Sequence, residues 1–129
     1  MILLCDEDVG TGVPKALTLV GYDARSLRGQ GWAGNADVTW LAHAGRLGWL
    51  VLSCNKKMLL VPEEREAIER HQVGIDFLTN GEDQVARVLR LLLMKWDTLE
   101  LLYNTSPRPF ARFLSLNGQL RTKYRQFVL

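Results

Sequence analysis

The stretch that decides the fold class lies near the start of the chain and reads Ile2-Leu3-Leu4-Cys5-Asp6-Glu7-Asp8. Its apolar residues stop abruptly at three acidic ones, which predicts a fully buried strand over Ile2–Cys5. Trp49–Ser53 is a similar apolar run, and Gly74–Leu78 is predicted as a further strand. Strands that are apolar on both faces are typical of parallel sheets with helices on both sides.

Helix signals separate these strands. Pro14 suits a first helical turn, and Val13, Leu17 and Val20 recur at helical spacing before Gly21. The remaining predicted elements are a strand at Tyr22–Leu27, a helix capped by Asn35 and ending at Leu47, a helix at Pro62–His71, and a long helix capped by Asn80 that ends near Trp96. This alternation over residues 2–96 predicts an α/β fold, with a mostly parallel sheet and helices on both faces.

The end of the chain carries a hairpin signal. Asn117-Gly118 lies between the strand-like runs Phe110–Leu116 and Gln119–Arg125, and an Asn-Gly pair in that position favours a tight turn. We therefore expect an antiparallel C-terminal hairpin over residues 110–125. The 129 residues are expected to form a single domain, with an α/β core over 1–96 and a C-terminal segment over 97–129.

Composition excludes several classes of protein. With 16 Lys and Arg against 14 Asp and Glu, the chain is neither a polycation nor a self-repelling disordered chain. Its apolar runs fall far short of the roughly 20 residues that cross a bilayer, so no membrane partner is expected. The sequence shows no basic leader, and a cytoplasmic location is expected. Two cysteines, Cys5 and Cys54, are too few for a disulfide framework or a four-cysteine zinc site, and a single bridge between them stays open.

Oxygen-bearing side chains are predicted to gather at one edge of the sheet. Asp6 follows the first strand with Glu7 and Asp8 behind it, and Asn55 follows the third strand. Asp37 and Glu64 open the helices that come after the second and third strands. Ligands of open parallel sheets bind beyond the carboxyl ends of the strands, and clustered carboxylates suit Mg²⁺ or Mn²⁺. The pattern indicates metal-dependent phosphate chemistry, although acids at helix starts also serve as caps and dipole partners.

Four pieces of sequence carry a resemblance to a known family. They are residues 4–8 (Leu-Cys-Asp-Glu-Asp), residues 37–40 (Asp-Val-Thr-Trp), residues 48–57 (Gly-Trp-Leu-Val-Leu-Ser-Cys-Asn-Lys-Lys) and residues 62–67 (Pro-Glu-Glu-Arg-Glu-Ala). In order and spacing, residues 1–78 resemble the single-domain branch of the PIN-like nucleases, which are often toxins of toxin–antitoxin pairs. Pro107-Arg108-Pro109-Phe110 is similar to the closing segment of that family.

The resemblance implies a function and a set of site residues. It implies a Mg²⁺- or Mn²⁺-dependent endoribonuclease acting on single-stranded RNA, with an antitoxin protein as partner. Asp6, Asp37 and the residue at position 55 would be the ligands and catalytic groups, with Glu64 as a further catalytic acid and Asp8 as a further metal ligand.

Position 55 departs from the family pattern. The family has an aspartate after the third strand, whereas this chain has Asn55, followed by Lys56 and Lys57. An amide oxygen can bind a metal ion but brings no negative charge, so a weakened site is expected. Either Asp8 or Glu64 compensates, or the chain is a catalytically impaired PIN-like domain. In the second case it would bind RNA, another protein or a second copy of itself.

Basic residues suggest a path for the RNA backbone. We expect phosphate contacts from Arg25, Arg28, Lys56, Lys57, Arg108 and Arg112. More basic residues, Arg121, Lys123 and Arg125, follow in the predicted hairpin. The alternative is that the C-terminal charges only protect an exposed edge strand from aggregation.

Overall fold

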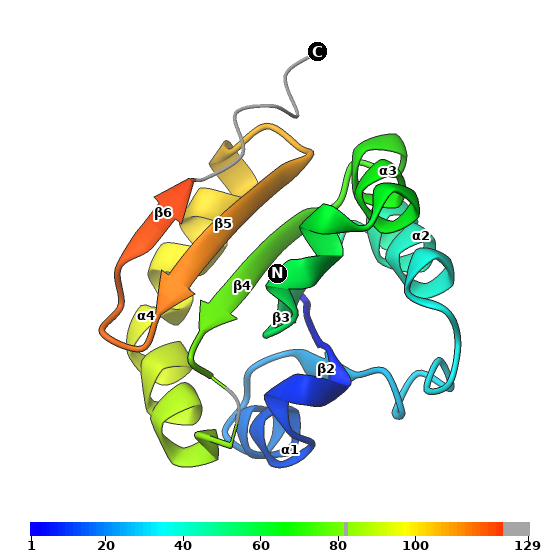
Figure 1. Cartoon of the computed structure of the whole chain (residues 1–129). Helices are drawn as coiled ribbons and strands as arrows, with labels where there is room; N and C mark the ends of the chain where they lie inside the picture. Colours follow the sequence, from blue (N-terminus) through cyan, green and yellow to red (C-terminus); the bar gives the residue numbers. More distant parts are fainter. Residues whose placement is uncertain (82, 123–129) are drawn as a thin grey trace.

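The computed structural model describes residues 1–81 and 83–122, which form a mixed sheet covered by helices (Figure 1). The strand order is β2-β1-β3-β4-β5-β6. The strands are β1 (Leu3–Cys5), β2 (Ala24–Ser26), β3 (Leu50–Ser53), β4 (Gly74–Thr79), β5 (Phe110–Ser115) and β6 (Leu120–Thr122). All neighbouring pairs are parallel except β5 and β6, which are antiparallel. The predicted α/β class with a mostly parallel sheet is confirmed.

Helices cover both faces of the sheet, as predicted. The helices are α1 (Gly12–Leu19), α2 (Asp37–Leu47), α3 (Pro62–Arg70) and α4 (Val85–Thr105), with short 3₁₀ helices η1 (Glu7–Val9) and η2 (Lys56–Leu60). Leu3 and Leu50 pack with α1 and α4 in one core cluster, and Leu4 and Val51 pack with α2 and α3 in another. Alternate residues of a strand point to opposite faces, so strands that are apolar throughout contribute to both clusters.

The chain reverses its winding between β1 and β3. From β1 the chain moves to β2 at one edge, and it then returns past β1 to β3 and continues toward β6. The carboxyl ends of β1 and β3 therefore lie side by side where the strand order reverses. In open α/β sheets this is the position at which ligands bind.

Several predicted helix ends are wrong. Asn35 does not cap α2, whose N-cap is Ala36, and Asn80 adopts a left-handed turn with φ of 61° before α4 begins at Val85. Val20 follows the end of α1 and is 61% exposed. The largest difference concerns α4, which continues past Trp96 to Thr105 because Leu99 and Tyr103 extend its buried stripe at helical spacing. The expected division at residue 96 falls inside this helix.

The C-terminal hairpin is confirmed within the described residues. Strands β5 and β6 pair antiparallel around Asn117-Gly118, and the Ser115 N–H donates to the Gln119 carbonyl at 2.9 Å. Gly118 has φ of 85°, a conformation that glycine adopts without steric cost. The hairpin is not simply appended, because β5 is itself the fifth parallel strand, beside β4. Residues 123–125 of the predicted second strand lie outside the described residues.

None of the helices in the described part of the chain has the combined length and apolar character that a bilayer-spanning helix requires.

Candidate active site at the carboxyl edge of the sheet

A hydrogen bond joins the ends of β1 and β3. Asp6 follows β1, and its Oδ2 accepts from the hydroxyl of Ser53, the last residue of β3, at 2.8 Å. The other carboxylate oxygen, Oδ1, accepts from the Glu7 N–H at 2.8 Å, which makes Asp6 the N-cap of η1. Both oxygens of Asp6 are thus held, and the side chain is oriented before any ligand binds.

Asp8 adds a second carboxylate to the same strand ends. The Cys54 N–H donates to Asp8 Oδ1 at 2.9 Å, and the Ser53 hydroxyl lies 3.5 Å from Asp8 Oδ2. Ser53 is fully buried, and its oxygen also accepts from the Asn55 N–H at 3.0 Å. The serine hydroxyl therefore lies between two carboxylates and the backbone after β3.

Asp37 and Glu64 add two more carboxylates, which come from α2 and α3, the two helices on the same face of the sheet. Asp37 is the first residue of α2, and its Oδ1 accepts from the indole N–H of Trp40 at 2.9 Å. Glu64 lies in the first turn of α3. Burial raises the pKa of Glu64 to about 7, together with a hydrogen bond shared with Asp37 and the charges of Asp37, Glu63 and Asp6. The carboxyl groups of Asp37 and Glu64 are thus direct neighbours.

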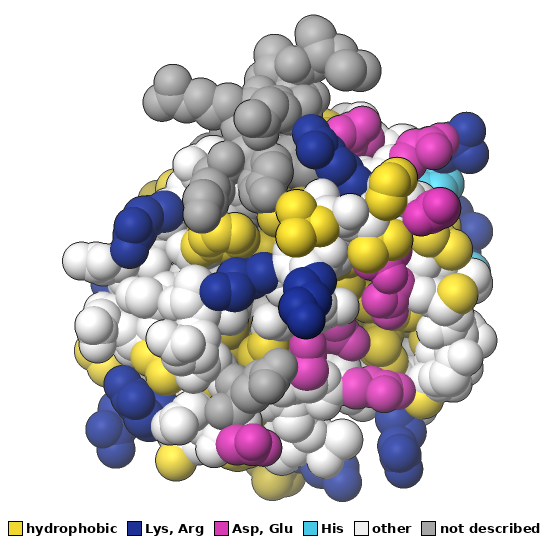
Figure 2. Space-filling model, in the orientation of Figure 1, with side chains coloured by type: hydrophobic (Ala, Val, Ile, Leu, Met, Phe, Trp, Pro, Cys, Tyr) yellow, Lys and Arg dark blue, Asp and Glu magenta, His cyan; other side chains and the backbone are white. Residues whose placement is uncertain are grey.

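The pKa of Asp6 is raised at this edge, where other carboxylates lie close to it. Burial, the nearby charge of Asp8 and, to a smaller extent, the charge of Asp37 raise this pKa, whereas the hydrogen bonds from Ser53 and Glu7 lower it; the net pKa is about 6. Carboxylates repel one another in this way unless a cation neutralises them. The structure thus brings Asp6, Asp8, Asp37 and Glu64 together where the strand order reverses. Figure 2 shows acidic side chains gathered on this part of the surface, with basic side chains beside them.

Comparison with known proteins identifies the family. Residues 1–80 match the family described as "PIN like domain", which is more than half of the chain. The chain belongs to the PIN-like domain family. Membership places it in a superfamily of nuclease type, and the matched residues include every acidic residue of the cluster. No curated protein and no solved structure matches the chain.

Asn55 of this PIN-like domain is the N-cap residue of η2 and lies two residues after the end of β3. Its side chain is half-buried and does not cap η2. Its backbone N–H reaches Ser53, so the residue lies at the edge where the acidic cluster forms. Among the described residues, no hydrogen bond joins the side-chain amide of Asn55 to any of the four carboxylates.

The donor set of the PIN-like domain suits a divalent cation. Among the residues that the structure describes, no three carboxylate, imidazole or thiol groups already enclose a position for a metal ion. However, the cluster consists of hard oxygen donors, and burial and mutual repulsion raise the pKa of both Asp6 and Glu64. A divalent cation favours such donors and would relieve that repulsion. The cluster thus offers oxygen donors of the kind that Mg²⁺ and Mn²⁺ prefer.

The structure does not bring all the predicted phosphate-binding residues together. Arg28 is exposed and lines a cleft of about 170 Å³ with Asp6, while Lys56 and the exposed Lys57 belong to η2, beyond β3. Arg25 is engaged by Asp23 at 2.7 Å and lies over the Trp49 ring.

The remaining two arginines lie away from the acidic cluster. Arg108 precedes β5, so it lies at the amino end of that strand, where its guanidinium covers Tyr103. Arg112 is only 4% exposed and forms a bidentate ion pair with buried Asp76, with bonds of 2.7 and 3.1 Å. The prediction that Arg112 binds RNA is therefore wrong, because a buried carboxylate on the neighbouring strand takes up its charge.

The sequence places Ser53 at the carboxyl end of the third strand, but Ser53 was not predicted as a site residue. It was visible as the polar last residue of an apolar strand, and polar residues at the carboxyl ends of parallel strands face the ligand edge. The two cysteines beside the cluster are buried and are not joined by a disulfide. Burial raises the pKa of the Cys5 thiol strongly, helped by the charges of Asp6, Cys54 and Asp8, so Cys5 is an apolar packing residue and no nucleophile.

Proposed function

We propose that this PIN-like domain is a Mg²⁺- or Mn²⁺-dependent endoribonuclease that cleaves single-stranded RNA. Its site would be formed by Asp6, Asp37 and Asn55, assisted by Asp8 and Glu64. The observation that carries the proposal is the meeting of Asp6, Asp8, Asp37 and Glu64 at the reversal of strand order, where the pKa of Asp6 and of Glu64 is raised. The family is of nuclease type, and the oxygen donors suit a hard divalent cation.

The chain's own residues would prepare the site for chemistry. When bound, the cation would stabilise the negative charge of the phosphate in the transition state and lower the pKa of a water molecule. Ser53 and the Glu7 N–H hold the Asp6 carboxylate in one orientation, so little rearrangement is needed on binding. The Trp40 indole does the same for Asp37. The pKa of Glu64, about 7, allows its carboxyl to hold or release a proton near neutral pH.

The surface on both sides of the cluster supports cleavage within a strand. On the β2 side, Arg28 and Asp6 line the cleft of about 170 Å³. On the β4 side, Cys54, next to Ser53, and Lys56 line a hollow of about 470 Å³, and Lys56 also lines a further hollow of about 430 Å³ that reaches Arg121. A strand of RNA can therefore approach from either side, and the basic side chains of Arg28 and Lys56 are available to contact its phosphates.

The biological setting would be that of a toxin with an antitoxin partner in the cytoplasm. This setting follows the resemblance to the single-domain PIN-like nucleases. A dimer of two copies is part of the same proposal, for either the nuclease or the impaired form.

The direct test is RNA cleavage by the purified chain. We expect slow cleavage of a 5′-labelled single-stranded RNA in Mn²⁺, loss of cleavage in EDTA, and loss in Asp6→Ala. Asp97→Ala, which changes an exposed acid on α4, is the matched control and should cleave like the wild type. Internal fragments would identify an endonuclease.

One observation favours a second function. Asn55 replaces a carboxylate of the family pattern, which weakens the case for turnover. If the chain cleaves no RNA with any divalent cation, or if cleavage survives both EDTA and Asp6→Ala, the nuclease proposal fails. The chain would then be a catalytically impaired PIN-like domain that binds RNA or protein.

A further inference from the structure

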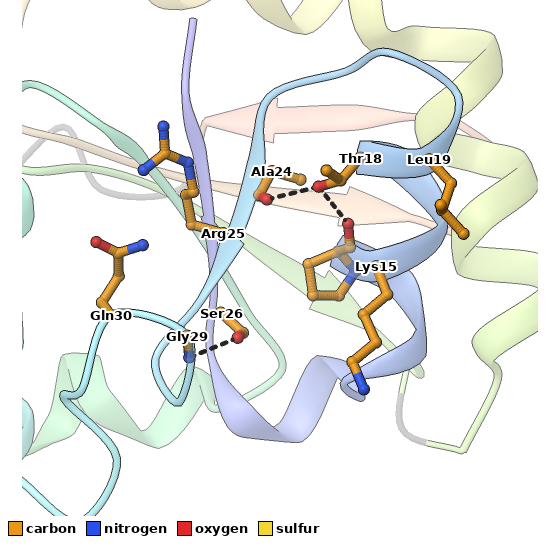
Figure 3. Close-up of a pocket in the computed structure, with 9 residues that line it drawn as sticks. Lys15, Thr18, Leu19, Ala24, Arg25, Ser26, Gly29 and Gln30 are labelled. Carbon is orange, nitrogen blue, oxygen red and sulfur yellow. Dashed lines mark hydrogen bonds between the residues drawn. The ribbon is translucent and has the colours of Figure 1, made fainter.

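A hollow of about 460 Å³ lies between α1 and the β2 edge of the sheet (Figure 3). Helix α1 contributes Lys15 and Leu19 on one side, while β2 and the loop after it contribute Arg25 and Gln30 on the other. The volume is within the roughly 300–1,000 Å³ of pockets that hold small organic ligands. No residue of the proposed metal site lines this hollow.

The hollow adjoins the cleft that Asp6 lines. Pro14 and Ser26 line both this hollow and the smaller cleft of about 170 Å³. That cleft is also lined by Asp6 and Arg28. A ligand that lies in the cleft beside Asp6 would pass Pro14 and Ser26 to enter the larger space.

The walls combine an apolar floor with a polar rim. Pro14, Leu19 and Ala24 present apolar surface, whereas Lys15 and Gln30 bring an ammonium group and an amide. Arg25 is fixed by Asp23 on one side and by the Trp49 ring on the other, so its planar guanidinium is held in place. A flat ligand would suit these walls if its faces were apolar, its edge could form hydrogen bonds with Gln30, and a negatively charged group beside it could contact Lys15.

The edge of β2 offers little to an added strand of another protein. The Ala24 carbonyl accepts from the Thr18 hydroxyl at 3.0 Å, and the Ser26 carbonyl accepts from the Gln30 N–H at 3.1 Å. The Ala24 N–H donates to the Tyr22 carbonyl at 3.1 Å. Since these groups are already bonded within the chain, β-strand addition would have to break them. A molecule that binds in the hollow is therefore expected to contact the side chains that line it, and not the backbone of β2.

We propose that the hollow is a base-binding subsite for the nucleotide next to the phosphate that the proposed cation would hold at the acidic cluster. The inference rests on the proposed function. A single-stranded nucleotide has an unstacked base with apolar faces, which suit Pro14, Leu19 and Ala24, and polar edges, which suit Gln30. Its phosphates suit Lys15, which lines the hollow, and Arg28, which lines the smaller cleft.

Abasic probes test this subsite. The probes are a 5′-fluorescein hexaribonucleotide of mixed sequence and six versions of it, each lacking one base. Binding to the full chain is measured by anisotropy in Mn²⁺, within a time over which a gel shows that the probe is still intact. In the wild type, removing the base at one position should weaken binding about tenfold, an effect of the size that a held base contributes. Removal at positions far from it should have little effect.

Matched variants locate the effect. Leu19 is 87% exposed and lines the hollow, whereas Leu101 is 62% exposed on α4 and does not. Leu19→Asp should abolish the tenfold difference between the full probe and the abasic probe, and Gln30→Ala should reduce it. Leu101→Asp should leave it unchanged. Both leucines are on the surface, so thermal melts should show all three variants folded.

The outcomes separate this inference from the proposed function. Equal binding of all probes by the wild type, or a full effect in Leu19→Asp, overturns the subsite even if RNA is cleaved. A position-dependent effect without any cleavage supports the subsite in an RNA-binding domain that lacks catalysis. Absence of RNA binding overturns it. A change of sedimentation in Leu19→Asp, with RNA binding unaltered, would assign the hollow to a protein interface and also overturn it.

Discussion

Replacing Asp6 with asparagine should stabilise the metal-free fold at alkaline pH. Burial and the charge of Asp8 raise the pKa of Asp6 from 3.8 to about 6. The folded state therefore holds the proton more tightly than the unfolded state. As the pH rises from about 4 through 6, the wild type loses stability, because the carboxylate must become charged next to Asp8 and Asp37. Asparagine never becomes charged, so the variant should lack this loss.

The expected size follows from the shift and from the hydrogen bonds. A rise from 3.8 to about 6 corresponds to about 3 kcal/mol of lost stability above pH 7, before solvent screening reduces it. An amide oxygen can accept from only one of the two donors, Ser53 and the Glu7 N–H, which costs about 1 kcal/mol. We expect Asp6→Asn to be more stable than the wild type by about 1–2 kcal/mol at pH 8, and less stable at pH 4.

Thermal and urea unfolding in EDTA from pH 4 to pH 8 measures this difference. For a chain of this size, 1 kcal/mol changes Tm by about 3–5 °C. Asp97→Asn is the control and should follow the wild type at every pH. In Mn²⁺ at pH 8 the order should reverse, because the cation stabilises the wild type and not Asp6→Asn. If Asp6→Asn is less stable than the wild type at pH 8 in EDTA, and the sign of the stability difference is the same at pH 4 and pH 8, the carboxylates at this edge do not destabilise one another as argued.

Three more outcomes are expected from residues beside the site and in the core. Asn55→Asp should tighten Mn²⁺ binding at least tenfold by calorimetry, because a negative charge about 4 Å from a divalent ion is worth several kcal/mol even at an effective dielectric constant of 20. Unchanged affinity would show that position 55 faces away from the ion. Arg112→Met should cost about 3–5 kcal/mol in urea unfolding by leaving Asp76 buried without its partner. The double variant with Asp76→Asn should recover part of that loss, and equal stability of the single and double variants would contradict this account. Cys5 should react with iodoacetamide at pH 8 at least tenfold more slowly in the folded chain than in urea, since burial raises its pKa, and equal rates would exclude that burial.

Local patterns were sufficient to predict the class of fold and the edge that carries the site. The apolar runs before Asp6 and before Asn55 indicated buried parallel strands, and their polar ends indicated the ligand edge. Asp37 was predicted to open a helix and is the first residue of α2. Such features depend on residues close together in the chain, because burial on both faces and helix starts are both encoded by neighbouring residues.

Helix ends were predicted less well, because caps and tertiary packing compete. Asn35 and Asn80 are good capping residues, yet α2 and α4 begin after them. The continuation of α4 to Thr105 depends on a surface for Leu99 and Tyr103 to cover, and β5 helps to form that surface. A sequence window around Trp96 contains no information about a strand that begins at Phe110.

The sequence by itself determined the alternation of strands and helices, the acidic residues at strand ends and helix starts, and the membership of a nuclease-type family. Only the tertiary structure decided which of these residues meet. The bond from Ser53 to Asp6 joins residues 47 positions apart, and the ion pair that removes Arg112 from any RNA surface joins residues 36 positions apart. Both contacts arise from the order of strands in the sheet. That order depends on packing across the whole domain, which no local pattern of the sequence encodes.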